Sequence, residues 1–142
     1  MNRQLRLASI ALAAAAAAGT AALAAAAAPP PPTTHEVRMV MEGTAARFEP
    51  AALTIRPGDR VRFVTVSGPP HNVAFDPAKL PAPARAALAA GMPDQMQPLA
   101  GPFVLETGAS YTIRFDGVPP GRYEFTCMPH AAMGMTGTVT VR

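Results

Sequence analysis

The stretch CMPHAAMGM, from Cys127 to Met135, holds an unusual share of the metal-binding side chains in this sequence. It contains the single cysteine of the 142 residues, one of the three histidines and three of the eight methionines. Thiolate, imidazole and thioether groups are soft donors that favour copper. Zinc more often takes four Cys, His or carboxylate ligands and rarely a thioether. The stretch therefore indicates a copper site.

The segment before this stretch, GRYEFTC, alternates as a strand does. Tyr123, Phe125 and Cys127 share one face, because side chains two apart point the same way. We therefore expect Cys127 to point inward behind two aromatic residues. On this pattern alone, a small buried hydrophobe is the commoner role of a free cysteine, so that alternative stays open.

The residues after Cys127 favour the metal site. Pro129 ends the strand, and a turn there lets His130 come back toward the thiol. Gly134 permits a second bend, after which Met135 has the same parity as the inward valines of the last strand, GTVTV. One loop can thus deliver sulfur, nitrogen and sulfur donors to one point.

A second histidine would complete a trigonal copper site with a weak axial methionine. His71, in GPPHNVAFD, is the candidate, because it follows a proline-braced loop at the start of a strand. His35 lies beside a proline-rich segment, and we expect it to be solvated. Two histidines, one cysteine and one methionine then make up the set.

The elements that must position these residues are short β-strands. Segments rich in β-branched and aromatic residues alternate with Gly/Pro turns, which predicts an all-β sandwich. One Ala/Leu run within 81–95 predicts a short helix near 84–90 in a long connection. The expected core is built on eight aromatic residues: Phe48, Phe63, Phe75, Phe103, Phe115, Phe125, Tyr111 and Tyr123.

The N-terminus has the pattern of a secretory signal peptide over 1–28: basic residues, an apolar Ala/Leu run and small residues of the A-x-A type at the expected cleavage region. An uncleaved anchor is the alternative. A proline-rich spacer (29–35) and one copper-binding domain (36–142) follow. We expect a periplasmic or extracellular protein that is not inserted in the membrane after processing. Without 1–28 the chain has ten basic and nine acidic residues, which gives no case for nucleic-acid binding.

GPPHNVAFD followed by YEFTCMPHAAMGMTGTVTV resembles the cupredoxin family, the small blue copper proteins, and within it plastocyanin and pseudoazurin. The resemblance extends upstream through FEPAALTIRPGDRVRF. It implies an eight-stranded Greek-key sandwich with one type 1 copper ion bound by His71, Cys127, His130 and Met135. It also implies that Asn72 ties the ligand loops together by hydrogen bonds. Met133, at the spacing of a shorter ligand loop, is the alternative to Met135.

This resemblance implies a non-enzymatic electron carrier, since no coordination position is left for a substrate. We expect a monomer that meets its redox donors and acceptors transiently. An uncharged apolar surface around His130 is the expected docking face: Pro70, Pro129, Ala131, Ala132 and Met133.

The alternative function is a periplasmic copper carrier. Four further methionines, Met39, Met41, Met92 and Met96, could supply Cu(I) sites for it, although such residues more often pack in cores. Copper-containing enzymes of this fold need a further set of histidines, and the sequence has no such set.

Overall fold

The computed structural model describes residues 28–142. The expected signal peptide over 1–28 therefore lies, except for Ala28, outside the described residues. Between residues 28 and 142, no helix has the length and apolar character needed to cross a membrane.

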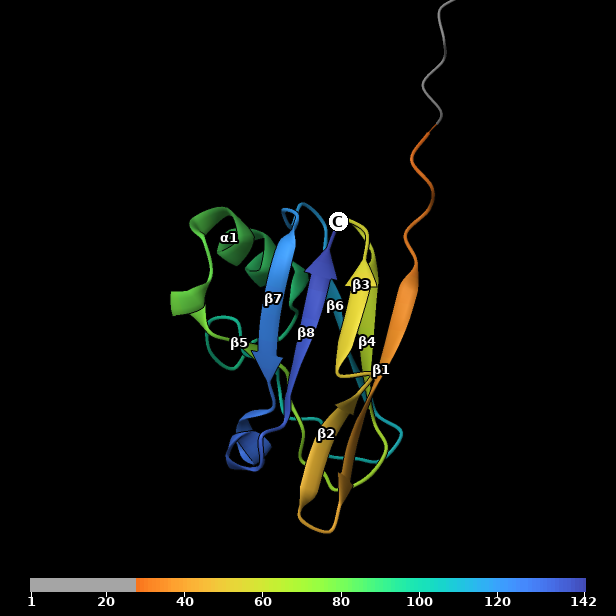
Figure 1. Cartoon of the computed structure of the whole chain (residues 1–142), viewed down its shortest axis with the longest axis vertical. Helices are drawn as coiled ribbons and strands as arrows, with labels where there is room; N and C mark the ends of the chain where they lie inside the picture. Colours follow the sequence, from red (N-terminus) through yellow and green to blue (C-terminus); the bar gives the residue numbers. More distant parts are fainter. Residues whose placement is uncertain (1–27) are drawn as a thin grey trace, which may run out of the picture. The chain divides into compact units, whose positions relative to one another are not determined.

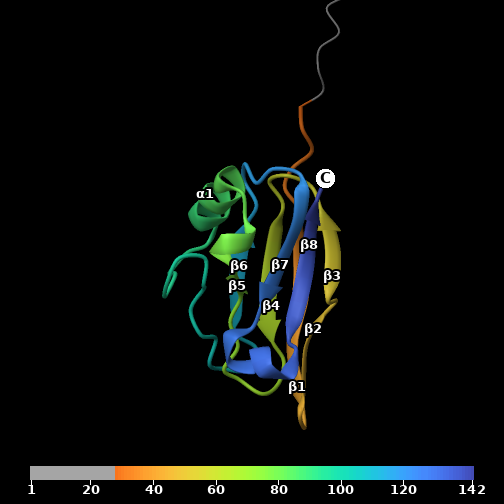
Figure 2. The ribbon, with the colours of Figure 1, turned by 60° about the vertical axis from the view of Figure 1, so that its left-hand side comes forward.

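In residues 28–142, eight strands form two four-stranded sheets, which face each other as a sandwich (Figures 1 and 2). The first sheet has the order β2-β1-β4-β6 and the second the order β3-β8-β7-β5. Within them β1 pairs with β4, and β3 with β8, in parallel. The strands are β1 (Thr34–Glu42), β2 (Ala45–Glu49), β3 (Ala52–Ile55), β4 (Arg60–Thr65), β5 (Ala74–Phe75), β6 (Ser110–Arg114), β7 (Gly121–Thr126) and β8 (Thr136–Val141). The expected eight-stranded sandwich is confirmed.

Strand alternation explains most of this arrangement. In β4, Val61, Phe63 and Thr65 are buried between exposed or half-buried neighbours, as the period of two requires. The sequence pattern did not mark β2, although it buries Ala46 and Phe48 in the same alternating way.

The core is centred on Phe125 of β7. Its ring centroid lies 4.8 Å from that of Phe48 and 5.3 Å from that of Phe63, both edge-to-face. The prediction of Phe103 as a core residue is wrong, since 43% of it is exposed. Phe103 belongs to an irregular segment between α1 and β6, where Val104 turns inward instead.

A long connection joins β5 to β6, each of which lies at one edge of its sheet. It contains a short 3-10 helix, η1 (Pro77–Lys79), and the helix α1 (Ala82–Gly91), which is longer than the expected 84–90. Ala84 and Leu88 of α1 are fully buried. Gly91 packs so closely on β6 that a Cβ atom there would lie 1.9 Å from the carbonyl oxygen of Arg114. This contact requires a residue without a side chain.

Asp59 anchors the start of β1. Its buried carboxylate accepts hydrogen bonds from the backbone N–H of Thr33 (2.8 Å) and of Arg56 (3.0 Å), and it lies 2.9 Å from His35 Nε2. Thr33 also accepts from Arg60 through its carbonyl oxygen at 2.8 Å. Strand β1 therefore begins at Thr34, within the expected spacer (29–35).

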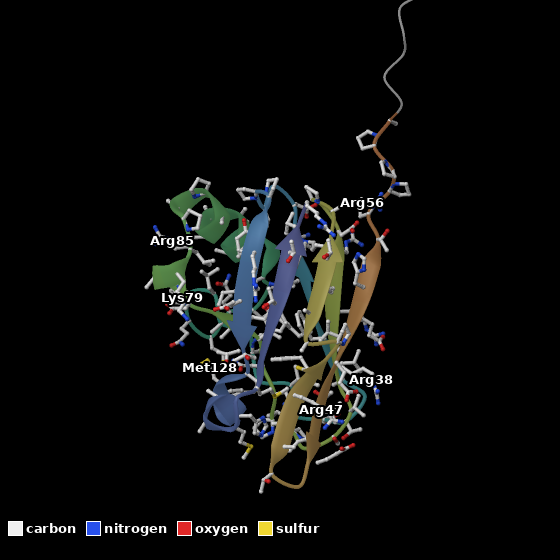
Figure 3. The ribbon with its side chains drawn as sticks, in the orientation of Figure 1. Arg38, Arg47, Arg56, Lys79, Arg85 and Met128 are labelled. Atoms are coloured by element: carbon white, nitrogen blue, oxygen red, sulfur yellow. The ribbon has the colours of Figure 1, made fainter. Side chains whose placement is uncertain are left out.

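The prediction that His35 is merely solvated is wrong, because it is paired with Asp59. Burial would raise the pKa of Asp59, but the hydrogen bonds from His35 and from the backbone of Thr33 and Arg56 lower it to about 2. Figure 3 shows Arg56 at this end of the sandwich and Met128 toward the other end.

Candidate metal centre

His71 is held by hydrogen bonds at its backbone and at its ring. Its backbone N–H donates to the carbonyl of Val104 at 3.1 Å, and its carbonyl accepts from Val104 N–H at 2.7 Å. The ring atom Nε2 lies 2.8 Å from the carbonyl oxygen of Ser67. Because a carbonyl can only accept, Nε2 carries the proton and Nδ1 is left with a free lone pair. His71 is fully buried and presents Nδ1 to Cys127.

Cys127 follows the last residue of β7 and points inward, as the alternation predicts, with no exposed surface. Its Sγ atom lies 3.6 Å from Nδ1 of His71 and 3.4 Å from Nδ1 of His130. His130 returns to the thiol through the 3-10 turn η2 (Met128–Met133), in which its backbone N–H donates to the carbonyl of Cys127 at 3.2 Å. The expected turn after Cys127 is therefore present.

Met135 and Met133 occupy different environments. Met135 is completely buried, and its carbonyl accepts from Cys127 N–H at 3.0 Å and from Thr126 Oγ1 at 3.1 Å. Met133 is 45% exposed. Gly134 separates the two in a left-handed conformation (φ 76°), which turns the chain inward toward β8. Burial therefore favours Met135 over Met133 as the fourth donor.

The donor atoms of His71, Cys127 and His130 all lie within 4.8 Å of one another. The distances from Sγ of Cys127 to the two Nδ1 atoms, 3.6 and 3.4 Å, fit a sulfur and nitrogens that share one metal ion at bond lengths of about 2.0–2.3 Å. Two imidazole nitrogens and one thiolate, with a buried thioether from the same loop, form the donor set that blue copper sites use. The residues present thus fit a copper ion.

Burial also controls the protonation of these ligands. It raises the pKa of the Cys127 thiol, against the opposing effect of the backbone N–H groups of Asn72 and His130. Burial, followed by the neighbouring ring of His71, lowers the pKa of His130. The metal-free site accordingly favours a neutral thiol and a neutral His130 imidazole. Metal binding must therefore displace the thiol proton.

Asn72 is fully buried beside the donors. Its side-chain Oδ1 accepts from Met128 N–H at 2.8 Å, and its Nδ2 donates to the carbonyl of Gly101 at 3.3 Å. The first bond connects the loops that carry His71 and Cys127, and the second connects Asn72 to the segment between α1 and β6. The side chain therefore occupies the place that the resemblance implies.

The residues expected to form a docking face around His130 are apolar. His130 itself is 7% exposed. All five residues expected at this surface are exposed: Pro70, Pro129, Ala131, Ala132 and Met133. Phe103 and Leu105, exposed on either side of Val104, add apolar area beside His71 that the sequence pattern did not predict.

The remaining candidate donors have other surroundings. His35 is paired with Asp59 at the start of β1. Met39 and Met92 are core residues, 0% and 3% exposed, and Met41 is half-buried against the core. Ser67 and Val104, which hold His71, were missed, because both act through backbone groups and no residue pattern marks such contacts.

Comparisons with known proteins agree with this chemistry. The family model for copper binding proteins, plastocyanin/azurin family, matches residues 35–142. A plastocyanin from Nostoc punctiforme is 38% identical over 110 residues, which cover 77% of this chain and 74% of that protein. A plastocyanin from Scenedesmus fuscus is 35% identical over 106 residues, which cover 75% of this chain and 97% of that protein.

Among solved structures, the oxidised plastocyanin of the fern Dryopteris crassirhizoma aligns with a TM-score of 0.61 and 30% identity. The alignment covers 76% of this chain and 100% of the fern protein. These matches confirm the resemblance inferred from the sequence and the expectation of a copper cofactor. They also agree with the expectation that the chain is not an enzyme.

Proposed function

Because this chain belongs to the plastocyanin/azurin family of copper-binding proteins, we propose that it is an exported blue copper protein that shuttles single electrons between redox partners. Copper, when bound, alternates between Cu(I) and Cu(II) and so takes up or releases one electron. The observation that carries the proposal is the convergence of two Nδ1 atoms on the sulfur of Cys127, at 3.6 and 3.4 Å.

In this proposal His71, Cys127 and His130 are the strong ligands, and Met135 is the weak axial ligand. Two features of the chain support these roles. The backbones of these three residues are held by hydrogen bonds, and the ring of His71 is also held by Ser67, so the donors need little rearrangement when the charge of the site changes. The side chain of Met135 is buried, whereas that of Met133 is 45% exposed.

We assign partner docking to the apolar surface around His130. A thiolate buried at 0% exposure cannot touch another protein, whereas His130 is 7% exposed and shares its turn with exposed Pro129 and Met133. Small apolar interfaces of less than about 1,200 Å² allow rapid exchange between redox proteins. The partners are therefore redox proteins that bind transiently, and the protein works as a monomer.

The copper-carrier alternative is less well supported. A carrier needs a ligand that another protein can reach, but Cys127 and His71 are both fully buried. Three of the four additional methionines, Met39, Met41 and Met92, pack in or against the core. Met96 is exposed, but a single thioether is a poor copper site.

Export is the part of the proposal that rests on the N-terminal sequence. The family match begins at His35, after the apolar leader and the proline-rich segment. Fractionation of cells that express the full chain, with N-terminal sequencing of the product, tests export directly. Recovery of the intact leader in the cytoplasmic fraction would contradict it.

The decisive experiment is a visible and electron-spin-resonance spectrum of the protein after addition of Cu(II). We expect an intense thiolate-to-copper band that ascorbate bleaches reversibly and that Cys127→Ser abolishes. Met128→Leu is the matched control, because it removes an exposed thioether next to Cys127 and should leave the band unchanged. A colourless protein that still binds Cu(I) would contradict electron transfer and favour the carrier.

The same spectra identify the axial ligand. Met135→Leu should shift the band position and raise the reduction potential, because a weak donor is replaced by a group that cannot coordinate. Met133→Leu should change neither. The reverse pattern would assign the axial role to Met133.

A further inference from the structure

The hydroxyl group of Ser67 binds both backbone groups of one residue on a neighbouring strand. Its Oγ atom accepts from Met41 N–H at 3.0 Å and donates to the carbonyl of Met41 at 2.8 Å. A hydroxyl group can do both at once, because it has one proton and two lone pairs. One side chain thus satisfies both polar groups of Met41.

This contact lies just beyond the end of a strand pairing. The parallel register of β1 and β4 ends at Met39 and Thr65, and Val66 N–H still donates to the carbonyl of Met39 at 2.9 Å. From Ser67 onward the chain leaves the sheet and forms the loop that leads to His71. The side chain of Ser67 therefore attaches the first residue of this loop to β1.

The next residue strengthens the attachment. Gly68 has φ 65°, and a Cβ atom placed on it would lie 2.4 Å from the Cβ of Met41. Residues 67 and 68 are therefore both held against Met41, the first by hydrogen bonds and the second by close packing. Rotation of the loop away from β1 would break both contacts.

The carbonyl oxygen of Ser67 is the group that receives the Nε2 proton of His71, at 2.8 Å. The position of this oxygen determines the direction of the His71 ring, and so the direction of Nδ1 toward Cys127. Hydrogen bonds of this kind fix both the tautomer and the orientation of a ligand histidine.

We propose that the Ser67 side chain is a positioning residue for the copper site: by attaching the loop to Met41 it holds the carbonyl that orients His71. This inference rests on the proposed function of His71 as a ligand. In this inference the hydroxyl of Ser67, which lies four residues before His71, helps to keep the His71 ring in a fixed orientation. The alternative is that Ser67 only terminates the pairing of β1 and β4 and stabilises the fold.

The test compares Ser67→Ala with Ser67→Thr, which retains a hydroxyl, and with Ser110→Ala. Ser110 is a matched control, because its exposed hydroxyl accepts from Nε of Arg62 rather than bonding to Met41 or His71. The first measurement uses the metal-free protein: solvent exchange of the His71 Nε2 proton, observed by ¹⁵N NMR. It needs no copper, so it does not depend on electron transfer.

We expect Ser67→Ala to exchange this proton about tenfold faster, the factor that corresponds to the loss of about one net hydrogen bond. Ser67→Thr should restore the protection, and Ser110→Ala should leave it unchanged. In the copper-loaded protein, Ser67→Ala should alter the copper hyperfine splitting and the reduction potential, and Ser67→Thr should restore them. Backbone amide protection in β7 and β8 should stay the same in all variants.

Two results would overturn the proposal. Unchanged exchange of the His71 Nε2 proton in Ser67→Ala would show that the attachment of Ser67 to Met41 does not control the orientation of the His71 ring. Faster exchange that extends to the amides of β7 and β8 shows a purely structural role. If instead the wild-type protein lacks the thiolate-to-copper band, the proposed function fails, while the exchange data still decide whether Ser67 orients His71.

Discussion

Oδ1 of Asn72 accepts a hydrogen bond from the backbone N–H of Met128 at 2.8 Å, and this bond joins loops that are 56 residues apart in the sequence. Asn72 directly follows His71, and Met128 directly follows Cys127. The bond therefore fixes the distance between two donors that come from different parts of the chain. Asn72 is fully buried, whereas Met128 is 39% exposed, so the bond lies between the interior and the surface.

Replacing Asn72 tests this connection. Asn72→Ala removes the partner of the partly buried Met128 N–H and that of the Gly101 carbonyl, whose bond to Asn72 is buried. We therefore expect the free energy of unfolding to fall by about 1–3 kcal/mol. Urea unfolding of the metal-free protein measures this loss. Gln97→Ala removes an exposed amide close to Met128 and should have little effect. Equal losses in the two variants would argue against a special role for Asn72.

A charge in the apolar surface tests the proposed docking face. Met133→Glu should keep the thiolate-to-copper band but slow electron self-exchange by about tenfold or more, because two like charges meet when two copies dock. NMR line broadening in mixtures of the oxidised and reduced protein gives this rate. Ala86→Glu adds the same charge on the exposed side of α1, away from the surface, and should leave the rate nearly unchanged. Similar slowing by both variants would place docking elsewhere.

The buried carboxylate of Asp59 predicts the acid stability of the fold. Its pKa is about 2 in the folded protein, against an ordinary value of 3.8. The folded state therefore gains stability from ionised Asp59 above about pH 4, and loses it as the pH falls from there toward 2. Asp59→Asn should lower the free energy of unfolding at neutral pH by about 1–3 kcal/mol and flatten its decline in acid.

Thermal unfolding between pH 2 and 7 measures this dependence. The matched control is Asp116→Asn, since Asp116 is exposed and only loosely paired with Arg114 at 3.8 Å. It should keep the wild-type acid profile. A wild-type profile in Asp59→Asn would show that other carboxyl groups carry the acid sensitivity.

The aromatic cluster predicts where the fold is most sensitive to truncation. Phe125→Ala removes a ring that packs on Phe48, Phe63 and Phe75, so we expect a loss of about 3–5 kcal/mol in the metal-free protein. Phe103→Ala removes a ring of the same size that is 43% exposed, and should cost less than about 1 kcal/mol. Denaturant titration compares the two, and similar losses would contradict the assigned core.

The sequence predicted the parts of the site that depend on local geometry. Alternation in β7 correctly pointed Cys127 inward, because strand parity depends only on the neighbours of a residue. The proline and glycine in CMPHAAMGM correctly marked the turn that returns His130 to Cys127. The burial of Met135 followed from its parity with β8.

Contacts between distant segments could not be predicted in this way. Ser67 meets Met41 across 26 residues, and Asp59 meets His35 across 24, so no local pattern shows either pairing. Asp59 also looks like an ordinary turn residue in PGD, although it is buried. Phe103 was misplaced because alternation says nothing about the direction of a side chain in an irregular segment.

The anchoring of β1 by Asp59 determines how the protein would be oriented on an electrode surface. Thr33 is held at the end of the sandwich near Arg56, whereas Met128 and the η2 turn lie toward the opposite end (Figure 3). If the protein were immobilised on an electrode through the residues just before β1, the end that carries His130 would therefore face the solution. Soluble reductants could reach that end, while direct conduction to the electrode would have to cross the length of the sandwich.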